Sequence, residues 1–134
     1  MSTLLVYSDK PDVRERVKTA IGRLPDPELG PVEFLDVAHG PEVVDAVDHG
    51  EADVCILDGE AAPSGGMGLS RQLKNEVPNC PPMVLLVARA DDRWLATWSL
   101  ADAIVTHPID PAELTAAVVG QLRARAAAVP AAGS

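Results

Sequence analysis

The sequence predicts an α/β fold built on a doubly wound, five-stranded parallel sheet with strand order 2-1-3-4-5. Short apolar runs, typical of strands buried on both faces, alternate five times with segments whose apolar residues recur at helical spacing. Such alternation implies parallel strands joined by helices that cover both faces of the sheet. The length of 134 residues fits one domain.

The first two strand–helix pairs follow from apolar spacing and from prolines. A strand is expected at residues 3–7, and a helix over 11–24 follows, ended by prolines. A second strand is expected at residues 32–37. A short helix then opens at Pro41 and closes at Gly50.

The third pair places an acidic side chain at a strand end. An apolar strand over residues 53–57 ends at Asp58, and a glycine-rich stretch over 59–68 leads into a helix that runs to about Glu76. The fourth strand, residues 83–87, is the most apolar of the five, so we expect it to be central in the sheet.

The last two pairs are shorter. Asp91 and Asp92 can cap a fourth helix, and residues 103–106 form a brief fifth strand. A last helix begins near Pro111. The tail over 126–134 is rich in Ala, Pro and Gly and is expected to be frayed or disordered, which leaves a domain over residues 1–125.

Composition excludes several classes of protein. A formal charge of −9 argues against a nucleic-acid-binding surface, which needs clustered Lys and Arg. No apolar run reaches the ~20 residues of a membrane span, and the N-terminus lacks the basic region of a signal peptide. We therefore expect a cytoplasmic protein in which Cys55 and Cys80 are reduced thiols.

Two carboxylates are expected to meet at the carboxyl edge of the sheet, where doubly wound sheets bind their ligands. Asp9 follows the first strand and Asp58 ends the third, and these strands are neighbours in the proposed order. A divalent cation such as Mg²⁺ would relieve their repulsion. The alternative is that both acids are merely solvated strand ends or helix caps.

Four segments form a pattern in a fixed order. Residues 4–14 join a hydrophobic strand to acids, and residues 54–58 form an apolar strand that ends in aspartate. Residues 67–74 open a helix with Met-Gly-Leu, and residues 101–109 end in His-Pro-Ile. Over about residues 3–125 the chain therefore resembles the CheY-like receiver domains of response regulators, which have a flavodoxin-like (βα)5 fold.

The resemblance implies phosphoryl transfer in two-component phosphorelay signalling. Asp58 matches the aspartate that accepts a phosphoryl group from a sensor histidine kinase, with Mg²⁺ neutralising the phosphoryl charge. Asp9 matches the acid that binds the metal, and Glu60 matches the position that offers its backbone carbonyl. The implied chemistry is at most self-phosphoryl transfer and slow autodephosphorylation, so the chain is not expected to be an enzyme.

Four positions depart from the family's pattern. Ser8 replaces an acid, so Mg²⁺ is expected to bind weakly or not at all. His107 replaces a lysine that grips the phosphoryl group, Val87 replaces a hydroxyl residue, and Ile104 replaces a rotating aromatic. His107 also fits a purely structural role, before a proline in a turn with a cis bond. Phosphorylation is therefore expected to be weak or conditional and to switch the domain weakly.

The partner surface is expected where receivers use their fourth helix, fifth strand and fifth helix for dimerisation or output. Trp94 and Trp98 lie one turn apart on the expected fourth helix, and Trp is enriched at interface hot spots. A homodimer through this face is one expectation. The alternative is that both rings belong to the core stripe of the helix.

Three functions remain open. The first is an atypical stand-alone receiver that acts by protein–protein contact. The second is a phosphorylation-independent pseudo-receiver adaptor. The third, a flavodoxin-like small-molecule or cobalamin-type domain, has less support because no glycine-rich phosphate loop follows the first strand.

Overall fold

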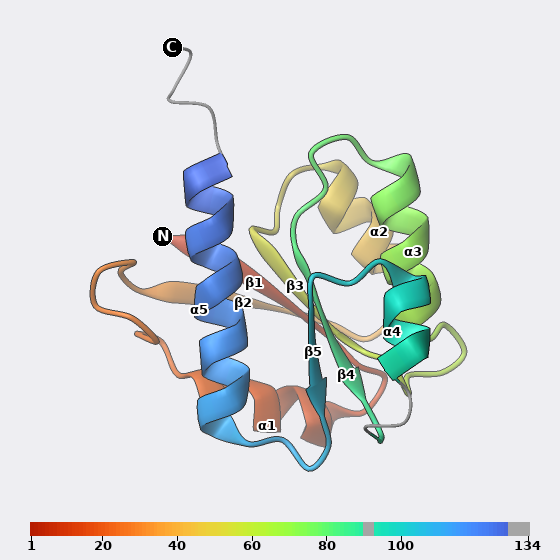
Figure 1. The fold of residues 1–134 in the computed structure, drawn as a ribbon, viewed down its shortest axis with the longest axis horizontal. Helices are drawn as coiled ribbons and strands as arrows, with labels where there is room; N and C mark the ends of the chain where they lie inside the picture. The colour runs from red at the N-terminus through yellow and green to blue at the C-terminus, as the bar shows by residue number, and fades with distance from the viewer. Residues whose placement is uncertain (90–92, 129–134) are drawn as a thin grey trace.

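The computed structural model describes residues 1–89 and 93–128. Strands and helices alternate throughout, as the apolar pattern predicts (Figure 1). Their bounds are β1 (Ser2–Tyr7), α1 (Pro11–Ile21), β2 (Val32–Val37), α2 (Gly40–Asp48), β3 (Val54–Asp58), α3 (Gly66–Glu76), β4 (Met83–Val87), α4 (Arg93–Ser99), β5 (Ala103–Thr106) and α5 (Pro111–Ala128).

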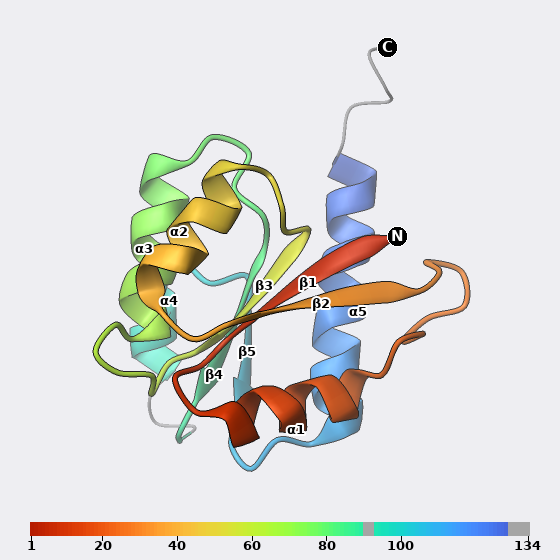
Figure 2. The ribbon, with the colours of Figure 1, turned by 180° about the vertical axis from the view of Figure 1, so that it is seen from behind.

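The sheet is parallel, with the order β2-β1-β3-β4-β5, which confirms the predicted fold class. Helices α1 and α5 cover one face, and α2, α3 and α4 cover the other (Figures 1 and 2). The fourth strand, β4, lies inside the sheet, as its apolar content predicts. The middle strand is β3, and β4 lies between β3 and β5; both are fully buried, so apolar content alone does not distinguish them.

Two apolar layers hold the helices to the sheet, because successive strand residues point to opposite faces. In β1, Leu5 and Tyr7 join the layer beneath α2 and α3, whereas Leu4 and Val6 join the layer beneath α1 and α5. Each fully buried aliphatic side chain contributes roughly 1.5–3 kcal/mol. The layers therefore fix the height of each strand end, and with it the position of the residues that follow.

Helix ends differ from the predicted ones in two places. Helix α1 ends at Ile21, ahead of the prolines, because Gly22 adopts a φ of 71° and stops the helix. Helix α5 runs through Ala128, so residues 126–128 are helical and do not belong to a frayed tail. The expected caps at residues 91 and 92 and the rest of the tail lie outside the described residues. Within the part of the chain that is described, the helices are too short or too polar to cross a membrane.

Candidate functional site

Asp58 lies at the carboxyl end of β3, and it is 2% exposed. The apolar run before it keeps β3 in the sheet core, and Gly59 ends the strand. The register pairs Tyr7 of β1 with Leu57 of β3, which brings the next residue of β1 beside Asp58. That residue is Ser8, whose hydroxyl donates to Asp58 Oδ2 over 2.8 Å.

Both oxygens of the Asp58 carboxylate accept hydrogen bonds. The Ser8 hydroxyl donates to Oδ2, and the backbone N–H of Glu60 donates to Oδ1 over 2.9 Å. Ser8 is itself fully buried, and its Oγ accepts from the Lys10 backbone over 3.1 Å. Neutral donors therefore hold the carboxylate in one orientation, which offsets the free energy of burying it.

Asp9 reaches the same edge of the sheet from β1. Its Oδ1 accepts from the backbone N–H of Ala62 over 3.3 Å, and Ala62 belongs to the loop that follows Asp58. The structure thus brings Asp9 and Asp58 to neighbouring strand ends of one edge. Unlike Asp58, Asp9 is exposed to solvent.

The loop between β3 and α3, residues 59–65, passes over this edge. Glycines allow close approach at both of its ends. A Cβ at Gly59 would lie 2.7 Å from the Leu86 carbonyl oxygen, and one at Gly66 would lie 2.8 Å from the Asp58 carbonyl oxygen. The Ala62–Pro63 peptide bond within the loop is cis. The loop is therefore packed closely against the strands.

Tyr7 is a site residue that sequence reasoning missed. Its phenol is 1% exposed and donates to the carbonyl of Ser64, in the loop, over 2.5 Å. Burial, followed by the nearby charges of Asp9 and Asp58, raises the pKa of Tyr7 above its usual value. A polar tip on Tyr7, directly after the aliphatic run of residues 4–6, was the available signal.

Arg14 is a second residue that the sequence analysis did not identify. It lies in the first turn of α1, and its Nη1 donates to the Ser8 carbonyl over 2.6 Å. Its Nε lies 3.4 Å from Asp36 Oδ2, and its side chain is only 15% exposed. Arg14 therefore ties the turn that carries Ser8 and Asp9 to helix α1.

The remaining predicted positions flank the site from β4 and β5. Val87 ends β4 and is fully buried, and the backbone N–H of His107 donates to the Val87 carbonyl over 2.9 Å. The His107–Pro108 bond is cis, as expected from the resemblance. Ile104 is partly buried against the core layer under α2 and α3.

The donor set fits a weak divalent-cation site. No cluster of three or more His, Cys, Asp or Glu side chains suited to a metal occurs within residues 1–89 and 93–128. Asp9 and Asp58 are the two carboxylates that the structure places at this edge of the sheet. Mg²⁺ is commonly bound by one or two carboxylates and completes its shell with water, so this set suits it.

Trp94 and Trp98 are surface residues. They are 69% and 48% exposed, so the alternative that both form the core stripe of their helix is wrong. The guanidinium of Arg71, from α3, lies 4.9 Å from the centre of the Trp98 ring and donates to the Trp98 carbonyl over 2.7 Å. Helices α3 and α4 are joined at this point.

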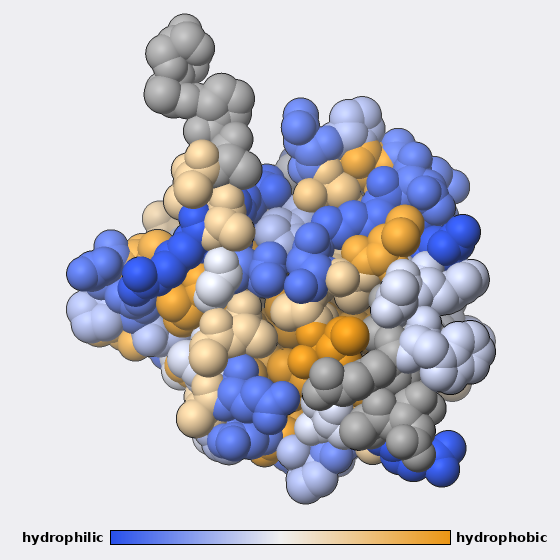
Figure 3. Space-filling view, viewed as in Figure 1, coloured by the Kyte–Doolittle hydropathy of each residue, from blue (hydrophilic) through white to orange (hydrophobic). Residues whose placement is uncertain are grey.

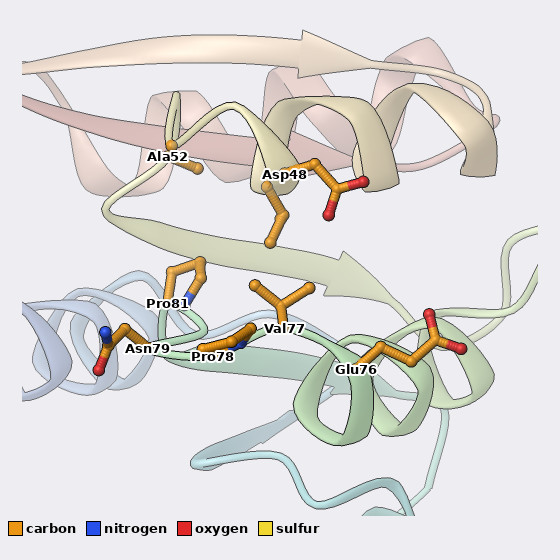
Figure 4. Close-up of a pocket in the computed structure, with 9 residues that line it drawn as sticks. Asp48, Ala52, Glu76, Val77, Pro78, Asn79 and Pro81 are labelled. Carbon is orange, nitrogen blue, oxygen red and sulfur yellow. The ribbon is translucent and has the colours of Figure 1, made fainter.

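A separate cleft of about 350 Å³ lies at the opposite edge of the sheet (Figure 4). The ends of α2 and α3 and the loops that follow them line it, with side chains that include Ala52, Val77 and Pro81. None of the predicted site residues lines this cleft.

The chain resembles known proteins in sequence and, separately, in fold. No protein-family model matches the chain. Two curated proteins, from two strains of Mycobacterium tuberculosis and each described as an uncharacterized response regulatory protein, are 50% identical over 123 residues. The match covers 92% of this chain and 92% of each relative.

Solved structures that share the fold of this chain are also response regulators or their receiver domains. The receiver domain of the Francisella response regulator 1452 has a TM-score of 0.76 at 20% identity, covering 92% of this chain and 98% of that chain. The response regulator protein TrrA of Thermotoga maritima, solved in complex with Mg²⁺-BeF, has a TM-score of 0.73 at 26% identity. That match covers 90% of this chain and 99% of TrrA.

The five-stranded fold is therefore that of a CheY-like receiver domain, a signalling domain that is generally not an enzyme. Such domains interact with histidine kinases or with effector domains. Because of the 50% identity to response regulatory proteins, the chain belongs to the response-regulator family of two-component signalling.

Proposed function

We propose that this response regulator accepts a phosphoryl group on Asp58, weakly or conditionally, and transmits the signal by protein–protein contact in the cytoplasm. The proposal is supported by the placement of Asp9 and Asp58 at neighbouring strand ends of one edge of the sheet, with Asp58 oriented by Ser8 and Glu60. An oriented carboxylate beside a second acid is the arrangement that phosphoryl transfer to aspartate requires.

In the proposed reaction, an oxygen of Asp58 attacks the phosphorus of a phosphohistidine on a sensor kinase. The new P–O bond forms as the P–N bond breaks, and the imidazole leaves with the electron pair. The Glu60 N–H and the Ser8 hydroxyl orient the attacking carboxylate. Asp9, Asp58 and the Glu60 carbonyl would hold Mg²⁺, which when bound neutralises charge on the phosphoryl group.

The test is incubation with acetyl phosphate and Mg²⁺, followed by intact-mass measurement. We expect the mass of one phosphoryl group to be gained slowly by the wild type and not at all by Asp58→Asn. Asp9→Asn should be phosphorylated more slowly still, because it loses a metal ligand. Equal phosphorylation of the wild type and Asp58→Asn would show that the acceptor lies elsewhere.

A second candidate is a phosphorylation-independent adaptor with the same fold. The observation in its favour is that Asp58 is 2% exposed with both carboxylate oxygens already hydrogen-bonded. Absence of any mass increase, together with partner binding that Asp58→Asn leaves unchanged, would favour this candidate.

The partner surface is proposed at the face formed by α4, β5 and α5, with homodimerisation as one use of it. Trp94 and Trp98 are exposed on α4, and Figure 3 shows apolar side chains at the surface between α5 and α4, over β5. Ala103 and Ile104 of β5 are partly exposed there. Exposed Trp beside partly exposed aliphatic residues has the composition of an interface core.

A further inference from the structure

The two groups that donate hydrogen bonds to Asp58 differ in how firmly they are held. Ser8 is fully buried, and its backbone is held from two sides: its N–H donates to the Val37 carbonyl over 3.2 Å and its own carbonyl accepts from Arg14. Glu60, in contrast, is exposed and lies in the loop between β3 and α3. A displacement of this loop would therefore free Asp58 Oδ1 and leave the bond from Ser8 in place.

Beyond Gly59 and Glu60, whose N–H groups donate to the Leu86 carbonyl and to Asp58 Oδ1, three further hydrogen bonds hold residues 61–64 of the loop. The Ala61 N–H donates to the Asp58 carbonyl over 3.2 Å, and the Ala62 N–H donates to Asp9 over 3.3 Å at the surface. Ser64 makes the third contact, to the buried phenol of Tyr7 over 2.5 Å. The third bond is the shortest, and its donor is shielded from water, so it has the least competition from solvent.

Ser64 is also confined from its other side. A Cβ at Gly40, the first residue of α2, would lie 2.8 Å from Ser64 Oγ. Ser64 thus sits between Tyr7 of β1 and the start of α2. The loop cannot lift from Asp58 without leaving this position.

We propose that Tyr7 holds the loop closed over Asp58, so that breaking the bond between the Tyr7 hydroxyl and the Ser64 carbonyl is the step that exposes Asp58. Tyr7 is a positioning residue, since it acts through the loop and touches no reacting atom. The inference rests on the proposed function for its consequence, phosphorylation, but the loop motion itself is measurable without it.

The direct test is Tyr7→Phe, which keeps the ring in the core and removes only the hydroxyl. Amide hydrogen exchange, followed by NMR, should accelerate at Ala61 and Ala62 by roughly threefold to tenfold, the factor that one intramolecular hydrogen bond contributes. The N–H of Cys55, which donates to the Pro82 carbonyl inside the sheet, should exchange at an unchanged rate. The phosphorylation rate with acetyl phosphate should rise by the same factor.

Thr115→Val is the matched control. Thr115 donates its hydroxyl to the Ala20 carbonyl over 3.2 Å, between α5 and α1 and away from the loop, so its loss should leave exchange at Ala61 and Ala62 unchanged. Gly40→Ala is an independent second variant, because its new methyl group would displace Ser64 and should also accelerate loop exchange.

Unchanged exchange at Ala61 and Ala62 in both Tyr7→Phe and Gly40→Ala would overturn the proposal. Faster exchange without faster phosphorylation, in a wild type that is phosphorylated, would overturn the gating of Asp58. Faster exchange in a protein that never gains a phosphoryl group would support the loop closure and contradict the proposed function instead.

Discussion

Ser8 has a different role from that of the acid it replaces. From the sequence alone it is a lost metal ligand, but in the structure its hydroxyl donates to Asp58 Oδ2 over 2.8 Å inside a closed site. A carboxylate at this position would repel Asp58 unless a cation were bound. The serine therefore stabilises the buried aspartate in the absence of metal, while it leaves one negative charge fewer at the proposed cation site.

Among single residues around the site, Arg14 is expected to contribute most to the free energy of unfolding. Replacement by Leu would leave the Ser8 carbonyl without its donor and remove one of the two cations beside Asp36, the other being Lys18. We expect Arg14→Leu to lower the free energy of unfolding by about 1–3 kcal/mol, measured by urea denaturation. The control is Arg16→Leu, two residues along the same helix.

Arg16 forms an exposed pair with Asp12, in which both side chains are more than half exposed. Its replacement should change the free energy of unfolding by less than about 0.5 kcal/mol. If both variants lost the same amount, the tie between Arg14 and Ser8 would contribute nothing particular to stability.

At the scale of elements, helix α5 is tied to the loop after α1 by an ion pair between Arg123 and Asp26. The hydrogen bond from Arg123 lowers the pKa of Asp26 below its ordinary value of 3.8. A lowered pKa in the folded state means that the stabilisation is complete above the ordinary value and is lost as the pH falls through the lowered one.

The measurement is urea unfolding of the wild type and Arg123→Gln across this range. We expect the wild type to be the more stable at about pH 6, and the difference to shrink once the pH falls below about 3.8. A difference that stays constant down to the lowest pH would show that the ion pair does not link α5 to Asp26 in solution.

Helix α4 carries the second prediction at this scale. Since Trp94 and Trp98 are 69% and 48% exposed, Trp94→Ala should leave the melting temperature nearly unchanged at low protein concentration. Trp98→Ala should lower it slightly, because the Arg71 guanidinium loses its stacking partner. Sedimentation at high concentration should show weaker self-association in both variants if the proposed interface is used.

A sharp drop in melting temperature in both variants of a monomeric wild type would count against the interface. In that case the rings would be packed in solution more deeply than their exposed fractions indicate, and the partner surface would lie elsewhere. Arg71→Ala serves as the control, because it removes the contact to Trp98 and leaves both rings in place.

At the scale of the whole molecule, the expected response to a phosphoryl mimic is small. Position 87 has no hydroxyl, position 104 no aromatic and position 107 no lysine, so few contacts would differ between the free and modified states. Beryllofluoride with Mg²⁺ should shift amide NMR signals mainly over residues 59–67. His107→Lys combined with Val87→Thr should enlarge the response.

Large shifts that spread to residues 94–100 and 103–106 in the wild type would contradict a weak switch. They would show that the domain couples its site to the α4–β5 surface by contacts other than the three missing ones. Asp58→Asn, treated in the same way, is the control for binding of the mimic at other positions.

Much of the fold could be predicted because its causes are local. The bounds of β2, β4 and β5 agree with the predicted ones to the residue. The cause is clearest in β4, an uninterrupted apolar run that is buried on both faces. The strand order followed from the alternation of elements. The meeting of Asp9 and Asp58 then followed from the order, because parallel strands end at one edge.

The sequence by itself thus determined the fold, the strand order and the edge where the acids lie. The tertiary structure alone decided what holds that edge: the bonds from Tyr7 to Ser64 and from Ser8 to Asp58 join residues 57 and 50 positions apart. The ion pair of Arg123 and Asp26, 97 positions apart, likewise ties α5 to the loop after α1. Apolar spacing specifies which face of an element is buried, but the polar atoms that meet depend on the height and rotation at which distant elements pack. Those are set by the whole core at once, so no local pattern encodes them.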